Sequence, residues 1–494
     1  MGFRRGDSFA LLLTLLPGPS SRHSHCQQSN VESHSEDPSM SEKTTQSIAI
    51  VGAGIAGATA ALGLRDAGFD VTLYSDKPRS ALRDEVPPTG VAVLFGRSRD
   101  WDAEVIEDLY SIGNTTGIST RLYSGAGDER ARVLEFNPDY NYVSQSVDVR
   151  LRADDRIGRF LDGGGKFEVT SVDVEALDGI AAGHDATFVA TGKGGLASLF
   201  EVDRDRTHYD EPQRRLLQVT LQGVEHSPEA FAYRNRDGAQ NAIFNLDAEN
   251  GEVYLGPFQH KDAGATWSFI VFAKPEGAWA SKFDAVNDAA SARAAIIDIF
   301  AEYFPEDAPV VAQLQNIESD PYSWLKGAVT PTVRKPVATT SGGHVVAGLG
   351  DTVISVDPVA GQGAQGALIQ ASELVKAAKE HAGQPFTEEW LTEQFEKYWE
   401  LRGRAAVEVT RLYLGDPDYA THLELSFPAA AVNANVASAL FGLLSDPNPL
   451  LTLESRDDVL AFIGAVSGES ADDVLGRFAP AGEFSAAEPV GAPA

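Results

Sequence analysis

The segment Gly-Ala-Gly-Ile-Ala-Gly at residues 52–57 constrains the fold of this chain more than any other feature. It follows the apolar run 47–51 and opens the Ala- and Leu-rich segment 55–67, after which residues 70–74 alternate between polar and apolar. This order predicts a strand, a tight turn, a helix and a second strand, which together form one βαβ unit. In such a unit the glycines permit the turn, let backbone N–H groups approach a pyrophosphate and let helix and strand pack closely. The residues that we expect to bind a dinucleotide here are Gly52, Gly54, Ile55, Ala56 and Gly57.

An acidic residue that binds the adenosine ribose is expected about 20 residues after these glycines. Asp76 lies 19 residues after Gly57 and is the candidate for this role. Ser75 stands at the end of the second strand, where the acidic residue is usually found, and we expect it to bind the cofactor as well. Two alternatives stay open: Asp76 is a turn residue without a ligand, and the glycine segment is a purely structural turn.

A second glycine-rich segment lies between the apolar run 344–349 and the helical pattern of residues 366–381. This order predicts a strand that ends near an Asp and a helix that begins soon after it. Such an arrangement is suited to a flavin, because the N-terminus of the helix stabilises the negative charge of a reduced isoalloxazine. An ordinary strand-loop-helix connection is the alternative. The residues expected to bind the flavin here are Asp351, Pro358, Gly361, Gln362, Gly363 and Ala364, with Pro358 and Gly361 at the catalytic position.

These segments resemble the FAD-dependent aromatic hydroxylases, and more closely the styrene and indole monooxygenase family. The blocks that carry the resemblance are IAIVGAGIAG at 48–57, VDVRL at 147–151, GGKF at 164–167, ATGK at 190–193, EPQR at 211–214, LKG at 325–327, and GLGD and VDPVAGQGA within 348–366. The resemblance covers about residues 47–450. It implies an α/β fold with a Rossmann-like FAD-binding domain of the aromatic-hydroxylase type.

The resemblance also implies site residues and partners. Arg150, Thr191 and Gly192 would bind FAD, and Arg83 would clamp its pyrophosphate, since arginine suits phosphate. Members of the family are the oxygenase half of a two-component system. In that system an NADH-dependent flavin reductase supplies reduced FAD, molecular oxygen forms a flavin C4a-hydroperoxide, and one oxygen passes to an alkene or indole.

Two features of the residues agree with an external source of electrons. A single GxGxxG opens a βαβ unit, so no second nucleotide-binding lobe for NADPH is expected. Single-component aromatic hydroxylases carry an Asp-Gly pair after the strand at 186–190, whereas this chain has Thr191-Gly192-Lys193. We therefore expect a separate reductase.

The sequence departs from the family pattern at one position near the reactive edge of the flavin. The pattern has an Asn three residues after the Arg at position 83, and this chain has Val86 there. An amide that would orient the peroxide or the substrate is therefore missing. Styrene or indole as the substrate is accordingly in doubt, and we expect a small hydrophobic alkene or aromatic more generally.

The reaction needs a dry pocket more than it needs a catalytic base, because water promotes loss of hydrogen peroxide. The natural cover is the strand-forming region 214–335, which is rich in aromatic residues. If residues 266–272 form one strand, Trp267 and Phe269 share a face and Phe272 points the other way. With Tyr254 and Phe258, these side chains form the aromatic set of this region. The alternative to a role in the substrate pocket is that they only fill the hydrophobic core.

These expectations give a domain plan. The FAD-binding domain comprises residues 47–210 and 336–385, with an inserted, sheet-rich substrate-binding domain at 211–335, a helical region at 386–480 and a tail at 481–494. Residues 79–145 are expected to be loops with short strands and helices. The aromatic residues around Trp390 should pack on the FAD-binding domain, and a contact with the reductase or with a second copy in a homodimer is the alternative.

Residues 1–46 differ from the rest and are interpreted as a disordered extension or a start assigned too early, with translation beginning at Met40. A secretory signal, suggested by Arg4, Arg5 and the apolar run 9–16, is the alternative. The only cysteine, Cys26, lies here, and later histidines lack metal-ligand spacing, so no disulfide or metal site is expected. We therefore expect a cytoplasmic protein.

Charge and motifs exclude several functions. The net charge of −31 opposes binding to nucleic acid or to anionic membranes, and no later apolar run approaches the length of a membrane span. Three alternatives to a two-component monooxygenase stay open: a self-sufficient flavin oxidoreductase, a halogenase and a non-catalytic flavin carrier. The halogenase is disfavoured because the sequence lacks a Trp-x-Trp-x-Ile-Pro run.

Overall fold

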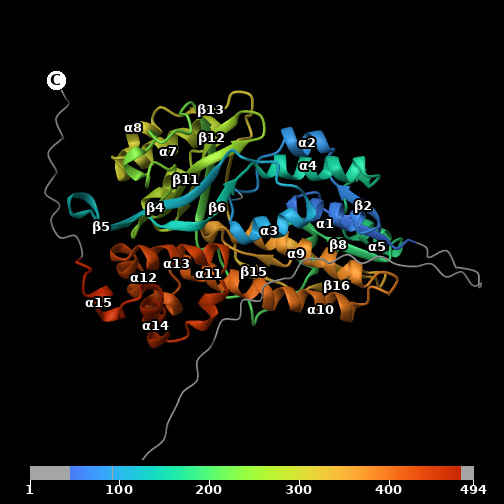
Figure 1. Cartoon of the computed structure of the whole chain (residues 1–494). Coiled ribbons are helices and arrows are strands. Elements are labelled where there is room, and N and C mark those ends of the chain that lie inside the picture. The colour runs from blue at the N-terminus through green and yellow to red at the C-terminus, as the bar shows by residue number, and fades with distance from the viewer. Residues whose placement is uncertain (1–44, 92, 480–494) are drawn as a thin grey trace, which may run out of the picture. The chain divides into compact units, whose positions relative to one another are not determined.

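The computed structural model describes residues 45–91 and 93–479, and two large sheets organise this part of the chain (Figure 1). The first is a six-stranded sheet with the strand order β16-β17-β8-β1-β2-β7. All its strand pairs are parallel except β16 with β17. Its strands are β1 (Ser47–Val51), β2 (Asp70–Ser75), β7 (Lys166–Val169), β8 (Ala186–Val189), β16 (Val337–Thr339) and β17 (Val345–Gly348).

The βαβ unit expected at the start of this sheet is confirmed. β1 pairs in parallel with β2, from Ser47 opposite Asp70 to Val51 opposite Tyr74, and α1 (Ile55–Asp66) connects them. Gly52 has φ +115°, and a Cβ on Gly57 would lie 1.9 Å from the carbonyl oxygen of Gly52. Only glycine fits both positions, because any side chain would push helix and strand apart.

Helices cover both faces of the six-stranded sheet, which is why its strands are apolar on both sides. Ile48 and Ile50 pack with α1, α4 and α9, whereas Val51 and Val189 pack with α5 and α10. The helices of these layers are α2 (Arg79–Asp84), α3 (Gly96–Val105), α4 (Val149–Asp162), α5 (Val174–Ala182), α9 (Gln362–Glu380) and α10 (Glu388–Tyr398). Helix α4 ends before Gly163 as expected, whereas α9 starts four residues earlier than expected, since Gly361 caps it at φ +63°.

The second sheet has ten strands, with β13-β9-β12-β11-β10-β4-β6-β3 as its main order, β14 paired to β9 and β5 to β4. Its strands are β3 (Val93–Leu94), β4 (Asn114–Ser124), β5 (Ala131–Phe136), β6 (Asp139–Ser146), β9 (Arg215–Gln222), β10 (Ala242–Asp247), β11 (Gly251–His260), β12 (Gly264–Ala273), β13 (Gln315–Asn316) and β14 (Trp324–Ala328). A third, two-stranded sheet pairs β15 (Thr332–Val333) with β18 (Ile354–Ser355).

The extent of the second sheet differs from the sequence-based plan. Residues 79–145 are not mainly loops, because they contain the 11-residue strand β4 and strands β5 and most of β6. These strands join the sheet expected only from residues 211–335, through the parallel pairing of β4 with β10. Strand β4 was not predicted, because its residues Asn114, Thr115 and Gly117 lack the alternation of apolar and polar residues that is typical of a strand. The domain division itself stays a prediction.

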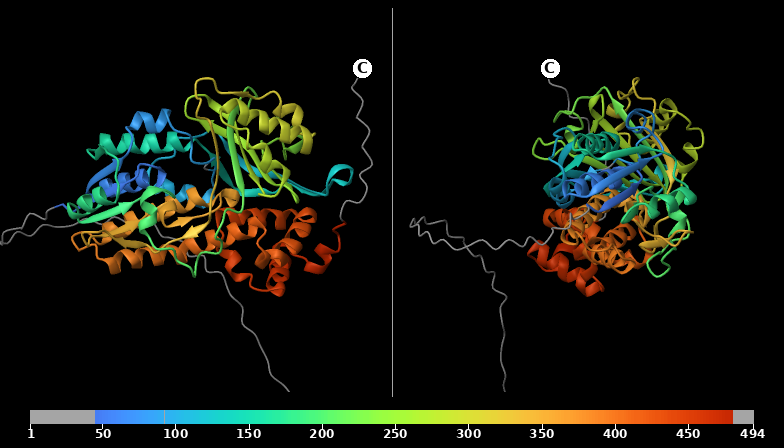
Figure 2. Two further views of the ribbon diagram at one scale, coloured as in Figure 1. Left: turned by 180° about the vertical axis from the view of Figure 1, so that it is seen from behind. Right: turned by 90° about the vertical axis from the view of Figure 1, so that its right-hand side faces the viewer.

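Two layers of helices enclose the ten-stranded sheet from opposite faces (Figures 1 and 2). On one face, Trp267 and Phe269 of β12 pack with α7 (Ala289–Tyr303). On the other face, Ile270 and Phe272 pack with the C-terminal helices, so the expected alternation of β12 is confirmed. The remaining helices are α6 (Ala278–Lys282) and α8 (Ala308–Val311), and at the C-terminal end α11 (Arg404–Leu414), α12 (Ala420–Val432), α13 (Ala434–Ser445), α14 (Arg456–Ser467) and α15 (Ala471–Leu475).

Helices α10 and α11 continue into each other through a π-helical turn at Trp399–Gly403. Phe395, Tyr398 and Trp399 pack into the core below the six-stranded sheet, as the sequence predicts for this amphipathic segment. The alternative roles of this helix, in a homodimer or in binding a reductase, stay predictions.

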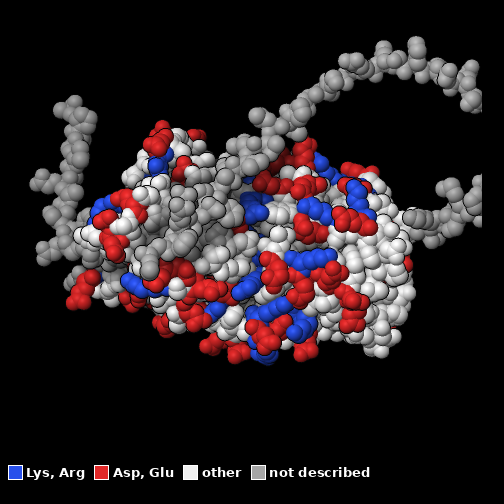
Figure 3. Space-filling view, turned by 60° about the horizontal axis from the view of Figure 1, so that its bottom comes forward, with Lys and Arg blue, Asp and Glu red and all other residues white. Residues whose placement is uncertain are grey.

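Acidic and basic side chains are interspersed over the face shown in Figure 3. Among the described helices, none is both long and apolar enough to cross a membrane. The same residues contain no group of three or more His, Cys, Asp or Glu side chains that could hold a metal ion. The interpretations of residues 1–39 and 481–494 concern segments outside the described residues.

Candidate functional site

A cavity of about 770 Å³ lies between the two sheets, and both glycine-rich segments contribute to its wall. A volume of this size is typical of pockets for cofactors and small molecules. The wall begins at the carboxyl ends of β1, β8 and β17, which is where open parallel sheets bind their ligands. The expected site residues that line it are Gly52, Gly54, Ile55, Ala56, Ser75, Asp76, Thr191, Gly192, Asp351, Pro358, Gly361, Gly363 and Ala364.

The two glycine-rich turns lie against each other. A Cβ built on Gly350 would come within 3.1 Å of the Ala56 Cβ. The backbone N–H of Gly192 donates to Oγ1 of Thr352 over 3.2 Å, which ties the loop after β8 to the loop after β17. One ligand can therefore touch the first turn, the Thr191 loop and the second turn at once.

Two helix N-termini open onto this cavity. Gly54 caps α1 and Gly361 caps α9, and a glycine has no side chain that could accept a hydrogen bond from the first N–H groups of its helix. A Cβ on Gly54 would meet nothing within 4 Å, so its backbone is open to the cavity. Unpaired N–H groups and the positive end of the helix dipole make such a terminus a binding site for anions.

The charged residues of the wall gather at this glycine-lined end. Asp351 pairs with Lys193 at 3.1 Å, and Asp76 pairs with Lys77 at 2.6 Å. The backbone N–H of Lys77 also donates to the Ser75 hydroxyl over 3.2 Å. Partly exposed pairs of this kind contribute little stability, so a ligand's hydroxyl or phosphate groups can replace either partner at small cost.

Arg150, which the family resemblance assigns to the cofactor, does not line the cavity. Its buried guanidinium donates to Asp148 over 2.8 Å and to Asp320 over 2.6 Å, and His260 Nε2 lies 2.8 Å from the same Asp320 carboxylate. Burial raises the pKa of Asp320, but the hydrogen bonds from His260 and Arg150 outweigh this and hold it well below its usual range. In this structure two carboxylates, one of them 170 residues later in the sequence, pair with the Arg150 guanidinium, and its expected role in binding FAD stays a prediction.

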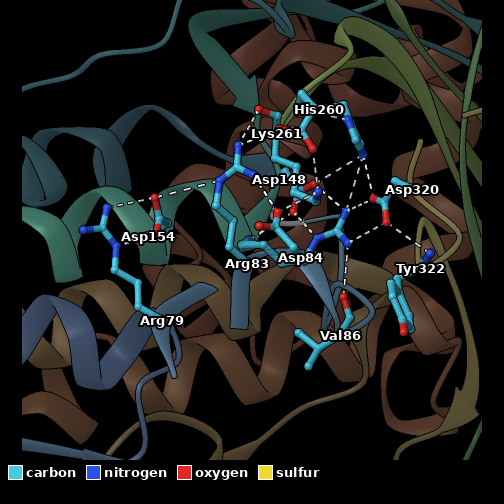
Figure 4. A network of polar contacts seen from close by, with 12 residues as sticks. Arg79, Arg83, Asp84, Val86, Asp148, Asp154, His260, Lys261, Asp320 and Tyr322 are labelled. Carbon is cyan, nitrogen blue, oxygen red and sulfur yellow. Dashed lines mark hydrogen bonds and ion pairs between the residues drawn. The ribbon is translucent and has the colours of Figure 1, made fainter. Parts of the chain in front are cut away.

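Arg83 likewise lies outside the cavity wall. It donates to Asp262 over 2.6 Å and to the Lys261 carbonyl over 3.2 Å, and it lies 3.9 Å from Asp154 (Figure 4). The acidic residues around it, together with Asp84, occupy the guanidinium that was expected to clamp pyrophosphate. In this structure Arg83 joins α2 to the turn between β11 and β12.

Two further expected residues serve the packing around the cavity. Gln362 is buried and turned away from it: its amide donates to the Ala360 and Leu444 carbonyls, and its oxygen accepts from Arg402 over 2.6 Å. Gly57 lies behind the wall, against the Gly52 carbonyl. Both therefore shape the turns without lining the site.

Val86, at the position of the missing Asn, lines the cavity together with Thr89, Gly90 and Val91. Its carbonyl accepts from Arg150 Nη1 over 3.1 Å. The buried ion network therefore fixes the start of this loop, which forms one side of the cavity.

Beyond the glycine-lined end, the cavity becomes apolar. Phe244, Tyr254, Ile270 and Phe272 of the ten-stranded sheet line it, whereas Phe258, Trp267 and Phe269 of the expected aromatic set are core residues. The rest of this lining could not be predicted from the sequence, because its members come from separate elements: Phe95, Ile118, Tyr140, Tyr413, Phe441 and Leu444.

Asp357 lies directly behind the second turn. It is fully buried, and one carboxylate oxygen accepts from the Val359 N–H over 3.0 Å. The other oxygen has no hydrogen-bond partner among the described residues. Burial raises the pKa of Asp357 to about 7, against the lowering effect of that N–H.

Comparison with known proteins shows which proteins the chain is similar to. Residues 192–309 match the model of the styrene monooxygenase A putative substrate binding domain, and residues 50–83 match that of the NAD(P)-binding Rossmann-like domain. Styrene monooxygenase StyA from Pseudomonas sp and the protein of the same name from Pseudomonas fluorescens are each 28% identical to this chain over 330 residues. These alignments cover 64% of this chain and 73% of each relative. These matches support a styrene monooxygenase-like family for this chain.

Solved structures support the same fold for this styrene monooxygenase-like chain. The flavin-dependent brominase Bmp2 aligns with a TM-score of 0.53 at 14% identity, over 87% of this chain and 97% of that one. PqsL of P. aeruginosa, in complex with 2-aminobenzoylacetate, aligns with a TM-score of 0.52 at 17% identity, over 76% and 98%. The α/β fold with a Rossmann-like domain and a helical C-terminal region is therefore confirmed.

As a styrene monooxygenase-like protein, the chain is a flavin-dependent enzyme with FAD as its cofactor, as the sequence predicts. The cavity fits this group. Its glycine-lined end offers two helix N-termini and the open backbone of Gly54 to phosphates, and its apolar half suits a planar ring. The positions of individual site residues against FAD stay predictions.

Proposed function

We propose that this chain is the oxygenase of a two-component system that transfers one oxygen atom to a small hydrophobic alkene or aromatic. The enzyme would act in the cytoplasm, where a separate NADH-dependent flavin reductase would supply reduced FAD. One observation carries the proposal: a single cavity joins the glycine-lined end, suited to FAD, to an apolar chamber suited to such a substrate.

The residues at the two ends of this cavity have different roles. Bound FAD supplies the activation of molecular oxygen. The N-terminal ends of α1 and α9 bind its negative groups, and Asp351 lies where it can accept from a ribityl hydroxyl. Phe272, Ile270 and their neighbours exclude water and hold the substrate next to Pro358 and Gly361.

The chain does not need to supply a nucleophile or a base for this reaction. The charged wall residues Asp76, Lys77, Lys193 and Asp351 all lie at the glycine-lined end, so the chamber offers shape and dryness. This arrangement supports oxygen transfer to an uncharged substrate, since an unpaired charge would lose its hydration there.

A reductase-coupled assay tests the proposal. The purified chain is mixed with FAD, NADH, oxygen and an independent flavin reductase, with catalase present to remove free hydrogen peroxide. Vinyl aromatics, indoles and terpenes serve as substrates, and products are identified by mass spectrometry with ¹⁸O₂. We expect singly oxygenated products carrying ¹⁸O only when the reductase is present.

The control reactions separate the competing functions. Consumption of NADH by the chain alone would show a self-sufficient oxidoreductase. Halide-dependent halogenated products would show a halogenase. Stable binding of oxidised FAD, with no oxygenated product from any substrate, would show a flavin carrier.

A further inference from the structure

Three tyrosines from three different elements line the apolar chamber. Tyr140 belongs to β6, Tyr254 to β11 and Tyr413 to α11, and all three line the cavity. Tyr140 is only 3% exposed and Tyr413 only 8%. They bring phenolic hydroxyl groups into a wall whose other side chains here are almost entirely hydrocarbon.

The hydroxyl of Tyr140 makes no hydrogen bond with any described residue. Its ring is held rigidly, since it stacks on Tyr142 with the centroids 4.9 Å apart and the planes 5° from parallel. By contrast, the Tyr142 hydroxyl, outside the cavity wall, donates to the Phe441 carbonyl over 3.2 Å. Buried hydroxyls normally have a partner, so an unpaired one in a cavity wall indicates a group that binds a ligand.

The other two tyrosines are only weakly paired. The Tyr254 hydroxyl lies 3.4 Å from Ser146 Oγ, and the Tyr413 hydroxyl lies 3.4 Å from the Leu440 carbonyl. Hydrogen bonds between oxygens are usually 2.5–3.0 Å long, so both contacts are weak. A phenol donates one hydrogen bond and accepts others, and all three hydroxyls therefore retain capacity for a ligand.

The chamber suits a neutral ligand group. Burial raises the pKa of Tyr254 to about 12 and holds the pKa values of Tyr140 and Tyr413 well above their usual range. The phenols are therefore uncharged at physiological pH. A charged substrate group would find no counter-ion among them.

The tyrosines lie at the end of the cavity where oxygen transfer is proposed. The Phe95 ring packs against Gly361, so that a Cβ on this glycine would lie 3.2 Å from it. Phe95 meets Tyr142 edge to face at 6.2 Å, and Tyr142 stacks on Tyr140. A continuous row of rings thus connects the second glycine-rich turn to the unpaired hydroxyl.

We propose that Tyr140, Tyr254 and Tyr413 select a substrate that carries one neutral hydrogen-bonding group, such as a hydroxyl, carbonyl or ring N–H, on an otherwise apolar frame. The inference rests on the proposed function and narrows its substrate class. A plain hydrocarbon would leave the phenols unpaired in a dry chamber, and sites built to pair a polar group discriminate strongly against analogues that lack it.

A matched pair of ligands tests this selection. 4-Hydroxystyrene and 4-methylstyrene have nearly the same shape and differ by a hydroxyl in place of a methyl group. Binding to the FAD-loaded protein is measured by equilibrium dialysis, and turnover is measured in the reductase-coupled assay. We expect wild type to prefer 4-hydroxystyrene, and Tyr140→Phe to reduce this preference roughly 3- to 10-fold, the worth of one neutral hydrogen bond.

Tyr123→Phe is the control, because Tyr123 lies on the same sheet but packs on the face of α7, away from the cavity. It should leave the preference unchanged, and Tyr254→Phe and Tyr413→Phe should lower it. If both compounds are turned over and wild type and Tyr140→Phe show the same preference for 4-hydroxystyrene, the inference is wrong and the proposed function still stands. A tyrosine-dependent binding preference without any oxygenated product supports the selection and overturns the proposed function.

Discussion

Thr352 and Gly192 hold each other through a reciprocal pair of hydrogen bonds. The Gly192 N–H donates to the Thr352 hydroxyl over 3.2 Å, and that hydroxyl lies 3.3 Å from the Gly192 carbonyl, to which it donates. The two residues follow the neighbouring strands β8 and β17, and Gly192 lines the cavity. A single buried hydroxyl thus sets the spacing between two loops that we expect to touch one cofactor.

The first prediction concerns this pair. Thr352→Val keeps the shape of the side chain but leaves both backbone groups of Gly192 without their partner. We expect the free energy of unfolding to fall by about 1–3 kcal/mol and the Kd for FAD to rise. Urea denaturation and fluorescence titration with FAD measure the two effects, and Thr352→Ser, which keeps the hydroxyl, should behave like wild type.

A second prediction separates two glycines of the first turn. Gly57→Ala places a Cβ 1.9 Å from the Gly52 carbonyl, so we expect a chain that folds poorly. The Cβ of Gly54→Ala would lie more than 4 Å from the surrounding protein atoms, so the chain should keep its thermal stability. Its methyl group projects where phosphates are expected, and weaker FAD binding should be its only defect. Equal FAD affinity in Gly54→Ala and wild type would place the pyrophosphate elsewhere.

A third prediction tests the placement of two arginines. Arg150→Met removes the cation between two buried carboxylates, and we expect the free energy of unfolding to fall by about 3–5 kcal/mol. Arg83→Met removes partly exposed ion pairs and should lower the free energy of unfolding by about 1 kcal/mol or less. Since Arg83 lies outside the cavity wall, its loss should change the Kd for FAD less than about twofold. A much larger loss of affinity in a well-folded Arg83→Met would show that this side chain moves to the cofactor.

The fourth prediction concerns Asp357 and pH. Because its pKa is raised from 3.8 to about 7, the folded state keeps its proton where the unfolded state has lost it. This group therefore stabilises the fold below about pH 4, and the contribution is lost as the pH rises to about 7. Asp357→Asn keeps the acceptor for the Val359 N–H and cannot ionise.

We expect Asp357→Asn to gain stability relative to wild type between pH 4 and pH 8, by up to about 4 kcal/mol. Chemical denaturation across this range measures the difference. Asp76→Asn, the same change at an exposed position, is the control for the loss of one carboxyl group. A constant difference between wild type and Asp357→Asn would mean that the carboxyl group titrates normally.

The features that sequence predicted well are local. The glycines of residues 52–57 define a turn through their own backbone geometry, and strand β12 shows its two faces through alternation alone. The second turn was found for the same reason, since Gly361 must adopt a positive φ where α9 begins. In each case, the signal lies within a few neighbouring residues.

The features that sequence analysis missed depend on contacts between distant segments. Arg150 was expected to bind FAD, and nothing near it in the sequence indicates its ion pair with Asp320, 170 residues later. Tyr413 belongs to a helix whose amphipathic pattern shows that one face is buried, but not that it faces a cavity. Strand β4 pairs with β10, more than a hundred residues away, and its polar start gave no sign of this.

The alternation of β12 has a consequence for engineering. Ile270 and Phe272 line the chamber, whereas Phe269 and Val271, beside and between them, pack with the α7 layer. Along this strand, substitutions at 270 and 272 therefore reshape the chamber, whereas substitutions at 269 and 271 lower the thermal stability. A mutant library that randomises 270 and 272 and keeps 269 and 271 fixed should yield far more active variants than the reverse.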